Sequence, residues 1–493
     1  MATTEQDRPV EPHGGEESSP RRAPAAKVEH FTVAERAARG KAARAEVPRT
    51  SHGEWEPPPH RPDPVALLLE QAETRVPELV PIRHGRMLVS PFTFYRGAAY
   101  LMASDLAGGP RTGLHTQLCG DAHLSNFGAF AAPDRRLIFS LNDFDETLPG
   151  PFEWDVKRLV ACFEVAGRDR GFDEKTRAGI NTEVARSYRE DLRSFATMRN
   201  LDIWYSRIHI EEVLEQFQRE AALKGQKAAQ ERAEANLAKT RTKDSMKAFK
   251  KLTEVVDGHV RIKGDPPLIV PIEDIAGDQL ERLDEFLHGV IRNYRRTLAG
   301  DRRKLLERFR YVHAARKVVG VGSVGTRAFI CLMVGRDEED PLFLQFKEAQ
   351  KSVLEPFLGR SEFDNSGQRV VEGQRLMQAA SDIMLGWIRP EGIDGVKRDF
   401  YIRQLWDAKG SALVDQLEPE VMFFYGRLCG SELARAHVRG GDGVAIASYL
   451  GNSDSFDRAM ARFAASYADQ NERDYAALKE AVESGRAPAQ VGL

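Results

Sequence analysis

The stretch RKVVGVGSVGTRAFICLMVGRDEEDPLFLQFKEA (residues 316–349) decides the fold class. It contains the pattern G-x-G-x-x-G at Gly320, Gly322 and Gly325, which by itself is a weak signal. A dinucleotide-binding fold requires a helix directly after such glycines. The residues that follow, TRAFICLMVG (326–335), are too short and too rich in strand-forming side chains to favour a helix. We therefore predict a glycine hairpin between two β-strands.

A third predicted strand, PLFLQFKEA (341–349), carries Lys347. In kinases, a glycine hairpin lays backbone N–H groups over the nucleotide phosphates, and a lysine on the third strand reaches the same phosphates. Lys347 at the end of an apolar strand is better interpreted in this role than as a surface lysine. The next predicted helix places Glu372 to pair with Lys347, although Glu348 and Glu355 compete for that role. Two further strands follow.

Polar side chains with the chemistry of a metal or phosphate site gather in two other stretches. The first is LCGDAHLSNFGAF (118–130), and the second is NDFDETLPGPFEWD (142–155). Each begins where an apolar strand ends, and the second runs into an amphipathic helix predicted over FEWDVKRLVACFEVAGRD (152–169). Such positions suit ligand binding because side chains converge there. The residues concerned are Asp121, His123, Asn126, Asp143, Asp145 and Asp155.

Together the two stretches carry a family resemblance. Residues 120–126, GDAHLSN, resemble the catalytic loop H-G-D-x-H-x-x-N of aminoglycoside phosphotransferases and choline kinases. Residues 142–155 resemble their block I-D-F-x-x-x-x-x-G-P-x-x-x-D. From LVPIRHGRMLVSPFTFYRGAA (79–99) to FYIRQLWDAKGS (400–411), the chain also resembles the uncharacterised bacterial domain-of-unknown-function family 2252 (DUF2252). That family supplies no established reaction.

The kinase resemblance implies a role for each matching residue. Asp121 would accept or orient the proton of the acceptor hydroxyl, and His123 would support the loop or touch the substrate. Asn126 and Asp143 would hold Mg²⁺, a cation that prefers oxygen ligands. Asp145 would be a second metal ligand or only a turn residue.

The remaining implied roles concern the nucleotide. Lys347 would hold the ATP phosphates, Glu372 would orient Lys347, and the backbone between Gly320 and Gly325 would cover the phosphates. Asp155 would anchor the loop from the start of its helix, where the helix dipole favours its charge.

The resemblance implies an α+β, protein kinase-like two-lobe fold with helical insertions. The Asp121 loop precedes the glycine hairpin, whereas kinases have the reverse order, so the fold would be circularly permuted. Close chain termini make a permutation physically plausible. We expect a disordered leader over residues 1–64, which are rich in Pro, Gly, Glu and Arg. A helical large lobe over 65–315, a β-rich nucleotide-binding lobe over 316–411 and a helical part over 412–493 would follow.

Two features of the sequence leave alternatives open. Cys119 stands where the related catalytic loops have a histidine, so a contact that supports the loop must be made otherwise. Arg83, Arg86 and Arg96 precede the loop and would either bind an anionic substrate or pair with acids.

Composition excludes several classes of partner. A net charge of -3 over 493 residues provides no general attraction to nucleic acid or anionic lipid. The four cysteines lack the spacing of zinc or disulfide sites. No signal peptide and no apolar span of membrane length is visible, which predicts a cytoplasmic protein. The basic stretch 224–251 is interpreted as a solvated helical face.

The function predicted is an ATP- and Mg²⁺-dependent phosphotransferase acting on a hydroxyl of a small molecule or a protein. One alternative is a pseudokinase that binds nucleotide without turnover, which only the missing histidine supports. Another is a metal-dependent phosphohydrolase using Asp121, His123, Asp143 and Asp145, which would leave Lys347 without a role. Transfer of AMP on the same fold is a fourth option. No residue pattern indicates the acceptor or the oligomeric state.

Overall fold

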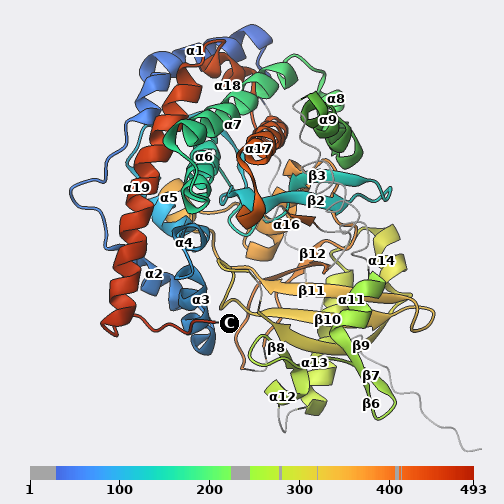
Figure 1. Cartoon of the computed structure of the whole chain (residues 1–493). Helices are drawn as coiled ribbons and strands as arrows, with labels where there is room; N and C mark the ends of the chain where they lie inside the picture. The colour runs from blue at the N-terminus through green and yellow to red at the C-terminus, as the bar shows by residue number, and fades with distance from the viewer. Residues whose placement is uncertain are drawn as a thin grey trace, which may run out of the picture.

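The computed structural model describes residues 29–223, 245–276, 280–318, 320–392, 394–405, 410–411 and 414–492. Within these residues the chain combines a helical part with a part built on a six-stranded sheet (Figure 1). The mixed helix and sheet composition expected from the sequence is confirmed. None of the described helices is both long and apolar enough to cross a bilayer.

Most helices lie in the part drawn above and to the left of the large sheet in Figure 1. They are α1 (Val33–Glu46), α2 (Pro64–Ala72), α3 (Val80–Met87), α4 (Pro91–Gly97), α5 (Ala99–Ala107), α6 (Phe152–Asp169), α7 (Glu174–Phe195), α8 (Asn200–Tyr205), α9 (Ile210–Leu223), α17 (Pro419–Gly440), α18 (Gly443–Leu450) and α19 (Ser455–Glu483). Short strands complete this part: β1 (His115–Leu118), β2 (Phe127–Ala131), β3 (Leu137–Leu141), β4 (Leu148–Pro151), β5 (Ile208–His209) and β14 (Gly410–Ser411).

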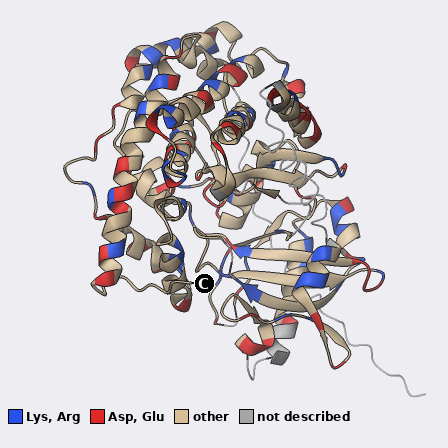
Figure 2. Cartoon of the chain, viewed as in Figure 1, with Lys and Arg blue, Asp and Glu red and all other residues tan. Residues whose placement is uncertain are grey.

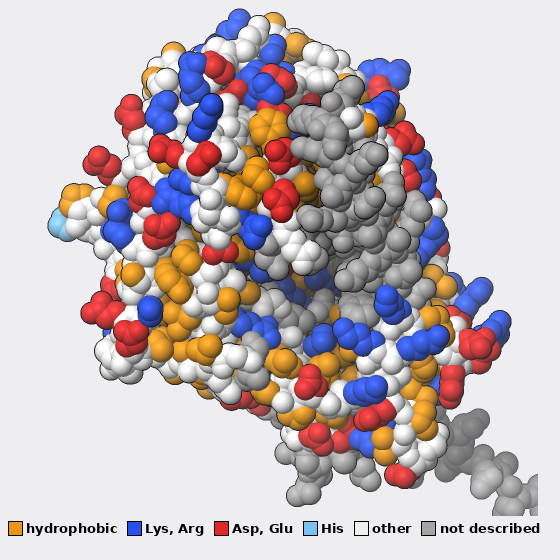
Figure 3. Space-filling view, viewed as in Figure 1, with side chains coloured by type: hydrophobic (Ala, Val, Ile, Leu, Met, Phe, Trp, Pro, Cys, Tyr) orange, Lys and Arg blue, Asp and Glu red, His pale blue; other side chains and the backbone are white. Residues whose placement is uncertain are grey.

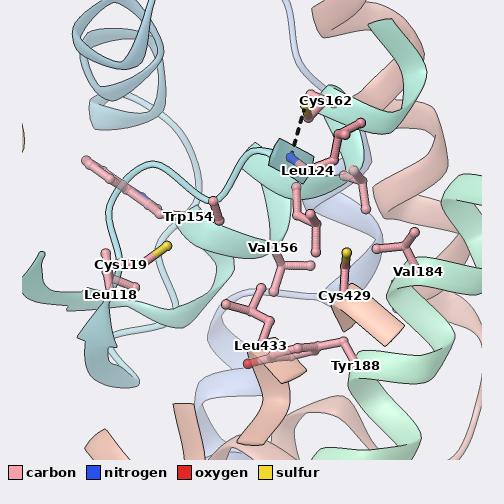
Figure 4. Packing of buried hydrophobic residues seen from close by; sticks show 14 of the residues in the cluster. Leu118, Cys119, Leu124, Trp154, Val156, Cys162, Val184, Tyr188, Cys429 and Leu433 are labelled. Atoms are coloured by element: carbon pink, nitrogen blue, oxygen red, sulfur yellow. Dashed lines mark hydrogen bonds between the residues drawn. The ribbon is translucent and has the colours of Figure 1, made fainter. Parts of the chain in front are cut away.

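The core of the helical part forms around α6. All but its last two residues are buried, because α7, α17 and α19 pack around it and leave it no solvent face. This helix matches the one predicted over residues 152–169. Figure 4 shows how the loop before β2 rests on this core: the backbone N–H of Leu124 donates to the Cys162 sulfur at 3.3 Å. The Asp121 loop is therefore supported by a close-packed interior.

The second part is an antiparallel sheet with the strand order β12-β13-β11-β10-β9-β8. Its strands are β8 (Ile269–Pro271), β9 (Arg310–Lys317), β10 (Ala328–Val334), β11 (Pro341–Glu348), β12 (Gly386–Ile388) and β13 (Phe400–Gln404). Around it lie α11 (Ser245–Leu252), β6 (Thr253–Val256), β7 (His259–Ile262), α12 (Ile272–Ala276), α13 (Leu280–Arg295), α14 (Gly300–Leu306) and α16 (Ser366–Met377), whereas α15 (Glu355–Leu358) packs on α5 and β4 of the helical part.

Both faces of the large sheet are covered, which explains why its central strands are apolar on both sides. Cys331 and Leu344 pack in a cluster with Tyr294 of α13, whereas Leu332 and Phe343 pack with Leu252 of α11. Alternate residues of a strand point to opposite faces, so a strand buried on both sides needs a continuous apolar run. The strands predicted on either side of the glycine-rich segment are confirmed as β9 and β10.

The expectation of a disordered leader is wrong for residues 33–55. Thr32 and Glu35 form a capping box that begins α1, and Gly40 lies so close to α18 that an added Cβ would be 2.0 Å from the carbonyl oxygen of Ala445. Trp55 packs edge-on against Tyr467 of α19, with the ring centroids 5.0 Å apart. The composition of this segment predicted disorder. The segment is ordered because it packs on apolar surface supplied by α18 and α19, which are distant in sequence. Residues 1–28 lie outside the described part of the chain.

The boundary expected at residue 316 falls inside β9, and β8 joins the sheet from still earlier in the chain. Helix α13 also packs on the sheet rather than on the helical part. The sheet-bearing part therefore begins well before the predicted position, because strand pairing recruits β8 from a stretch whose local pattern is weak.

Candidate active site

A cavity of about 1190 Å³ lies where the helical part meets the sheet. Figure 3 shows the surface hollowed between the two parts, with Lys and Arg side chains along the hollow, and Figure 2 shows acidic and basic residues interleaved there. The loop of Asp121 and the stretch from Asp143 to Glu146 line the cavity, as do Gly320, Gly322 and Ser323. The tertiary structure thus brings together the segments singled out in the sequence.

The backbone of the Asp121 loop is held from two sides. Gly120 has a φ of 83° and approaches the next acidic loop so closely that a Cβ would lie 2.3 Å from the carbonyl oxygen of Glu146. The Asp155 carboxylate accepts from the backbone N–H of Cys119 at 2.8 Å and of Gly120 at 3.1 Å. His437 Nε2 lies 3.2 Å from the same carboxylate. The predicted anchoring role of Asp155 is confirmed, and it supplies support for a loop that has Cys119 in place of histidine.

Asp121 itself is paired with a residue that the sequence did not single out. Its Oδ1 accepts from Arg158 Nε at 2.8 Å, and its Oδ2 lies 3.7 Å from His123 Nε2. Burial raises the pKa of the Asp121 carboxyl, and the Arg158 guanidinium opposes that shift. Burial, with help from the charges of Arg96 and Arg158, holds the pKa of His123 well below its ordinary value. His123 is therefore neutral at pH 7.

Two oxygen donors of the predicted metal set face the same cavity. Asn126 directly precedes β2 and Asp143 follows β3, at the end of the strand pair where Phe127 lies opposite Leu141, and the N–H of Asn142 donates to the carbonyl oxygen of Asn126 at 2.8 Å. Asn126 Nδ2 donates to the carbonyl oxygen of Asp121 at 2.6 Å, which leaves its Oδ1 as the atom suited to a cation. Among the described residues, no group of three His, Cys, Asp or Glu side chains forms a ready metal cluster.

Asp145 has a different set of partners from the one predicted. Its carboxylate forms an ion pair with Lys347 and accepts from the Tyr401 hydroxyl at 2.9 Å and from the Ser323 hydroxyl at 3.3 Å. Asp143 lies 3.7 Å from the same ammonium group. Although burial opposes it, Lys347 lowers the pKa of Asp145, so this carboxylate is ionised. These partners occupy both carboxylate oxygens, which favours an ion-pair role over metal binding.

The predicted pairing of Glu372 with Lys347 is wrong. Glu372 lies on α16 and pairs with Arg375 one turn later at 3.2 Å. From the same helix, the buried Arg369 donates to the carbonyl oxygens of Thr147 at 2.7 Å and Asp145 at 2.8 Å. Helix α16 therefore supports the acidic loop through the side chain of Arg369, which donates to backbone carbonyl oxygens of that loop. The sequence spacing placed Glu372 on the right helix but could not indicate which face turns inward.

The glycine-rich segment is fixed to the helical part. Arg86 donates to the carbonyl oxygen of Gly320 at 2.6 Å, and the N–H of Val76 donates to that of Gly325 at 2.8 Å. Val324 is fully buried in a small cluster with Val76 and Leu79. Gly320 and Gly325 have φ values of 67° and 94°, a region that favours glycine. The segment therefore closes one side of the cavity.

No pattern in the sequence indicated that three further residues would belong to this site. Arg158 and Arg369 are basic residues inside amphipathic helices, where a solvated face is the default interpretation. Tyr401 occupies an ordinary position in a strand. Each is decisive only because the fold turns it toward an acid or a carbonyl oxygen of a distant segment.

A comparison with known families matches most of the chain, including both the helical part and the large sheet. The family model for DUF2252, described as an uncharacterised protein conserved in bacteria, matches residues 75–481. The chain belongs to this family. The match covers the Asp121 loop, the glycine-rich segment and the arginines of α3 and α4. Searches of curated proteins and of solved structures found no significant match.

Proposed function

We propose that this DUF2252 protein is an ATP- and Mg²⁺-dependent phosphotransferase that acts on a hydroxyl acceptor. The observation that carries the proposal is the ion pair between the buried Lys347 and Asp145, flanked by Asp143. Both aspartates line the cavity together with the Asp121 loop and the glycine-rich segment. A strand lysine, a glycine-rich segment and a loop with Asp and Asn are the parts that kinases place around ATP.

The path of the chain supports a permuted kinase-like arrangement. The C-terminal end of α17, which follows the sheet in sequence, lies beside β1, which enters the Asp121 loop. Thr116 of β1 donates to the carbonyl oxygen of His437 at 2.7 Å, and an added Cβ on Gly440 would lie 2.7 Å from the Gln117 side chain. In space, sheet, helix and loop thus follow one another in the order that kinases have along the sequence.

Each group has a defined task in this proposal. Asp121, oriented by Arg158, accepts the proton of the acceptor hydroxyl. Lys347 contacts the phosphates, and its ion pair with Asp145 fixes its position before the nucleotide binds. Asn126 and Asp143 would hold Mg²⁺, which supplies charge neutralisation to the transferred phosphate when bound. Positioning and charge neutralisation are the main requirements of phosphoryl transfer.

A nucleotide-binding protein without turnover is the second candidate. The observation that favours it is the pair between Asp121 and Arg158, since the guanidinium opposes the burial that raises the pKa of Asp121 and so makes the carboxylate a weaker base than burial alone would. A phosphohydrolase built on Asp121, His123, Asp143 and Asp145 would leave Lys347 only its ion pair with Asp145, without a part in catalysis.

The experiment that tests the proposal is calorimetric titration of ATP into the full chain, with and without Mg²⁺. We expect binding that requires Mg²⁺ in the wild type and is lost in Asp143→Ala. Asp364→Ala is the matched control, because Asp364 is an exposed aspartate on the rim of the same cavity. Absence of ATP binding in all conditions would refute the proposal, and binding without ATP consumption for any acceptor would favour the second candidate.

A further inference from the structure

Three arginines line the cavity on the side of the N-terminal helices: Arg75, Arg83 and Arg96, here called the arginine cluster. Arg75 and Arg83 are 7% and 0% exposed. Within the described part of the chain, no carboxylate forms an ion pair with any of the three. Their Nε atoms, and Nη1 of Arg83, are buried without a hydrogen-bond acceptor among the described residues.

The contacts that these arginines do make are with neutral oxygens. Arg83 Nη2 donates to Gln71 Oε1 at 2.7 Å and to the carbonyl oxygen of Gly97 at 2.8 Å, and Arg75 donates to the carbonyl oxygen of Val324. These bonds hold the guanidinium groups in place. The carboxylates of Glu146, Asp145 and Glu348 attract Arg75 without forming an ion pair with it. Burial lowers the pKa of Arg75 to about 10, and burial with the charge of Arg75 lowers that of Arg83.

Buried charges are costly unless they are paired. Arginine remains protonated in proteins, so the cluster does not lower this cost by losing protons. Unused N–H donors on neighbouring guanidinium groups are the arrangement that binds phosphate oxygens, because each group offers parallel donors. The cluster therefore has the chemistry of a phosphate site that the protein alone does not fill.

Arg96 relates the cluster to the acceptor side of the cavity, whereas Arg75 donates to Val324 of the glycine-rich segment. The charge of Arg96 lowers the pKa of both His123 and Asp121, as expected for close neighbours. His123 is 7% exposed, and its Nδ1 is buried without a partner among the described residues. By contrast, Lys347 approaches the cavity from the sheet. Arg96 and His123 thus border Asp121, the proposed proton acceptor.

We infer that the arginine cluster binds a phosphate group carried by the acceptor, which places the acceptor hydroxyl at Asp121. The assignment to the acceptor rests on the proposed function, whereas the phosphate site itself does not. The substrate class is then a phosphorylated alcohol, in contrast to the cationic acceptors that a site lined only by acids would select.

The first test is calorimetric titration of inorganic phosphate into the full chain without nucleotide. We expect binding in the wild type, and affinity about tenfold or more lower in Arg96→Gln and in Arg83→Gln, because each loses charge-assisted hydrogen bonds. Arg398→Gln is the matched control: Arg398 lines the same cavity but is already paired with Asp394 at 2.7 Å. We expect it to bind phosphate like the wild type.

Arg96 is only half-buried, so Arg96→Gln keeps the test decisive if Arg83→Gln does not fold. Thermal melting with and without phosphate provides a second measurement, since phosphate should raise the wild-type melting temperature and leave that of Arg96→Gln unchanged. Undetectable phosphate binding by the wild type, or equal affinity in the wild type and Arg96→Gln, would overturn the inference.

The second test separates the acceptor from the nucleotide. Phosphate is titrated into protein saturated with a non-hydrolysable ATP analogue and Mg²⁺. Simultaneous binding of both supports the acceptor assignment. Competition between them, together with weakened binding of the analogue in Arg96→Gln, would assign the cluster to the nucleotide and overturn the inference. If the analogue does not bind at all, the proposed function fails, while the titration of phosphate alone still decides the phosphate site.

Discussion

Lys347 and Asp145 form an ion pair across 202 residues of sequence. The lysine lies near the end of β11 and is 2% exposed, whereas the aspartate lies in the loop after β3. The pair connects the sheet with the helical part at the wall of the cavity. Tyr401, directly opposite Lys347 on β13, donates to the same carboxylate at 2.9 Å and fixes its orientation.

Removal of one partner from this pair should destabilise the fold. We expect Lys347→Met to lower the free energy of unfolding by about 1–3 kcal/mol, because Asp145, whose side chain is 25% exposed, loses its closest cationic partner. The double variant Lys347→Met/Asp145→Asn should lose less than the sum of the single variants, since it leaves no isolated charge. Chemical denaturation measures all three. Additive losses would show that the two side chains do not interact.

Asp121 should be needed for turnover and dispensable for nucleotide binding. We expect Asp121→Asn to lower ATP consumption about 10²- to 10⁴-fold, because the proton acceptor is lost, and to leave the affinity for an ATP analogue unchanged. Steady-state kinetics and calorimetry measure these quantities. Asp364→Asn, on the rim of the same cavity, is the control. An equal loss of nucleotide affinity in Asp121→Asn would contradict the assigned role.

Gly120 offers a direct test of the contact between the two loops. Gly113 has a similar φ of 69° but no atom within 4 Å of an added Cβ, which makes it the matched control. Both Ala variants should lose about 1 kcal/mol through backbone strain. Gly120→Ala should lose about 1–3 kcal/mol more, because its Cβ would collide with the carbonyl oxygen of Glu146. Similar losses in the two variants, measured by denaturation, would argue against the close approach.

Glu432 on α17 should make stability depend on pH. Burial raises its pKa to about 7 although Arg435 opposes the shift, whereas the unfolded chain has a value near 4.5. Between these values the folded state binds more protons, so the free energy of unfolding falls as pH rises. The loss should reach at most about 3 kcal/mol by pH 7.

In Glu432→Gln this decline should be absent, and the stability difference between the two proteins should narrow or reverse as pH rises from about 4.5 to 7. Denaturation curves at several pH values measure the difference. Ser140, which donates to the carboxylate, can also donate to the amide, so the variant preserves that contact. Parallel pH profiles would contradict the raised pKa.

Local patterns predicted several elements correctly. The glycine-rich segment does connect two strands, Lys347 does lie on the third, and α6 begins and ends at the expected residues. Each depends on neighbours in sequence: turn-forming glycines, a continuous apolar run, or apolar residues at helical spacing. The grouping of Asp121, Asn126 and Asp143 at one cavity also followed from their positions at strand ends.

The sequence by itself determined the helix α6, the strands on either side of the glycine-rich segment and the strand of Lys347, because those choices depend on residues within a few positions of one another. Only the tertiary structure decided that Lys347 pairs with Asp145 rather than Glu372, that Arg158 holds Asp121, and that α1 is ordered. Each of these contacts joins segments that are distant in sequence. Their partners are selected by how helices and sheet pack and by the cost of burying unpaired charge, which no local pattern records.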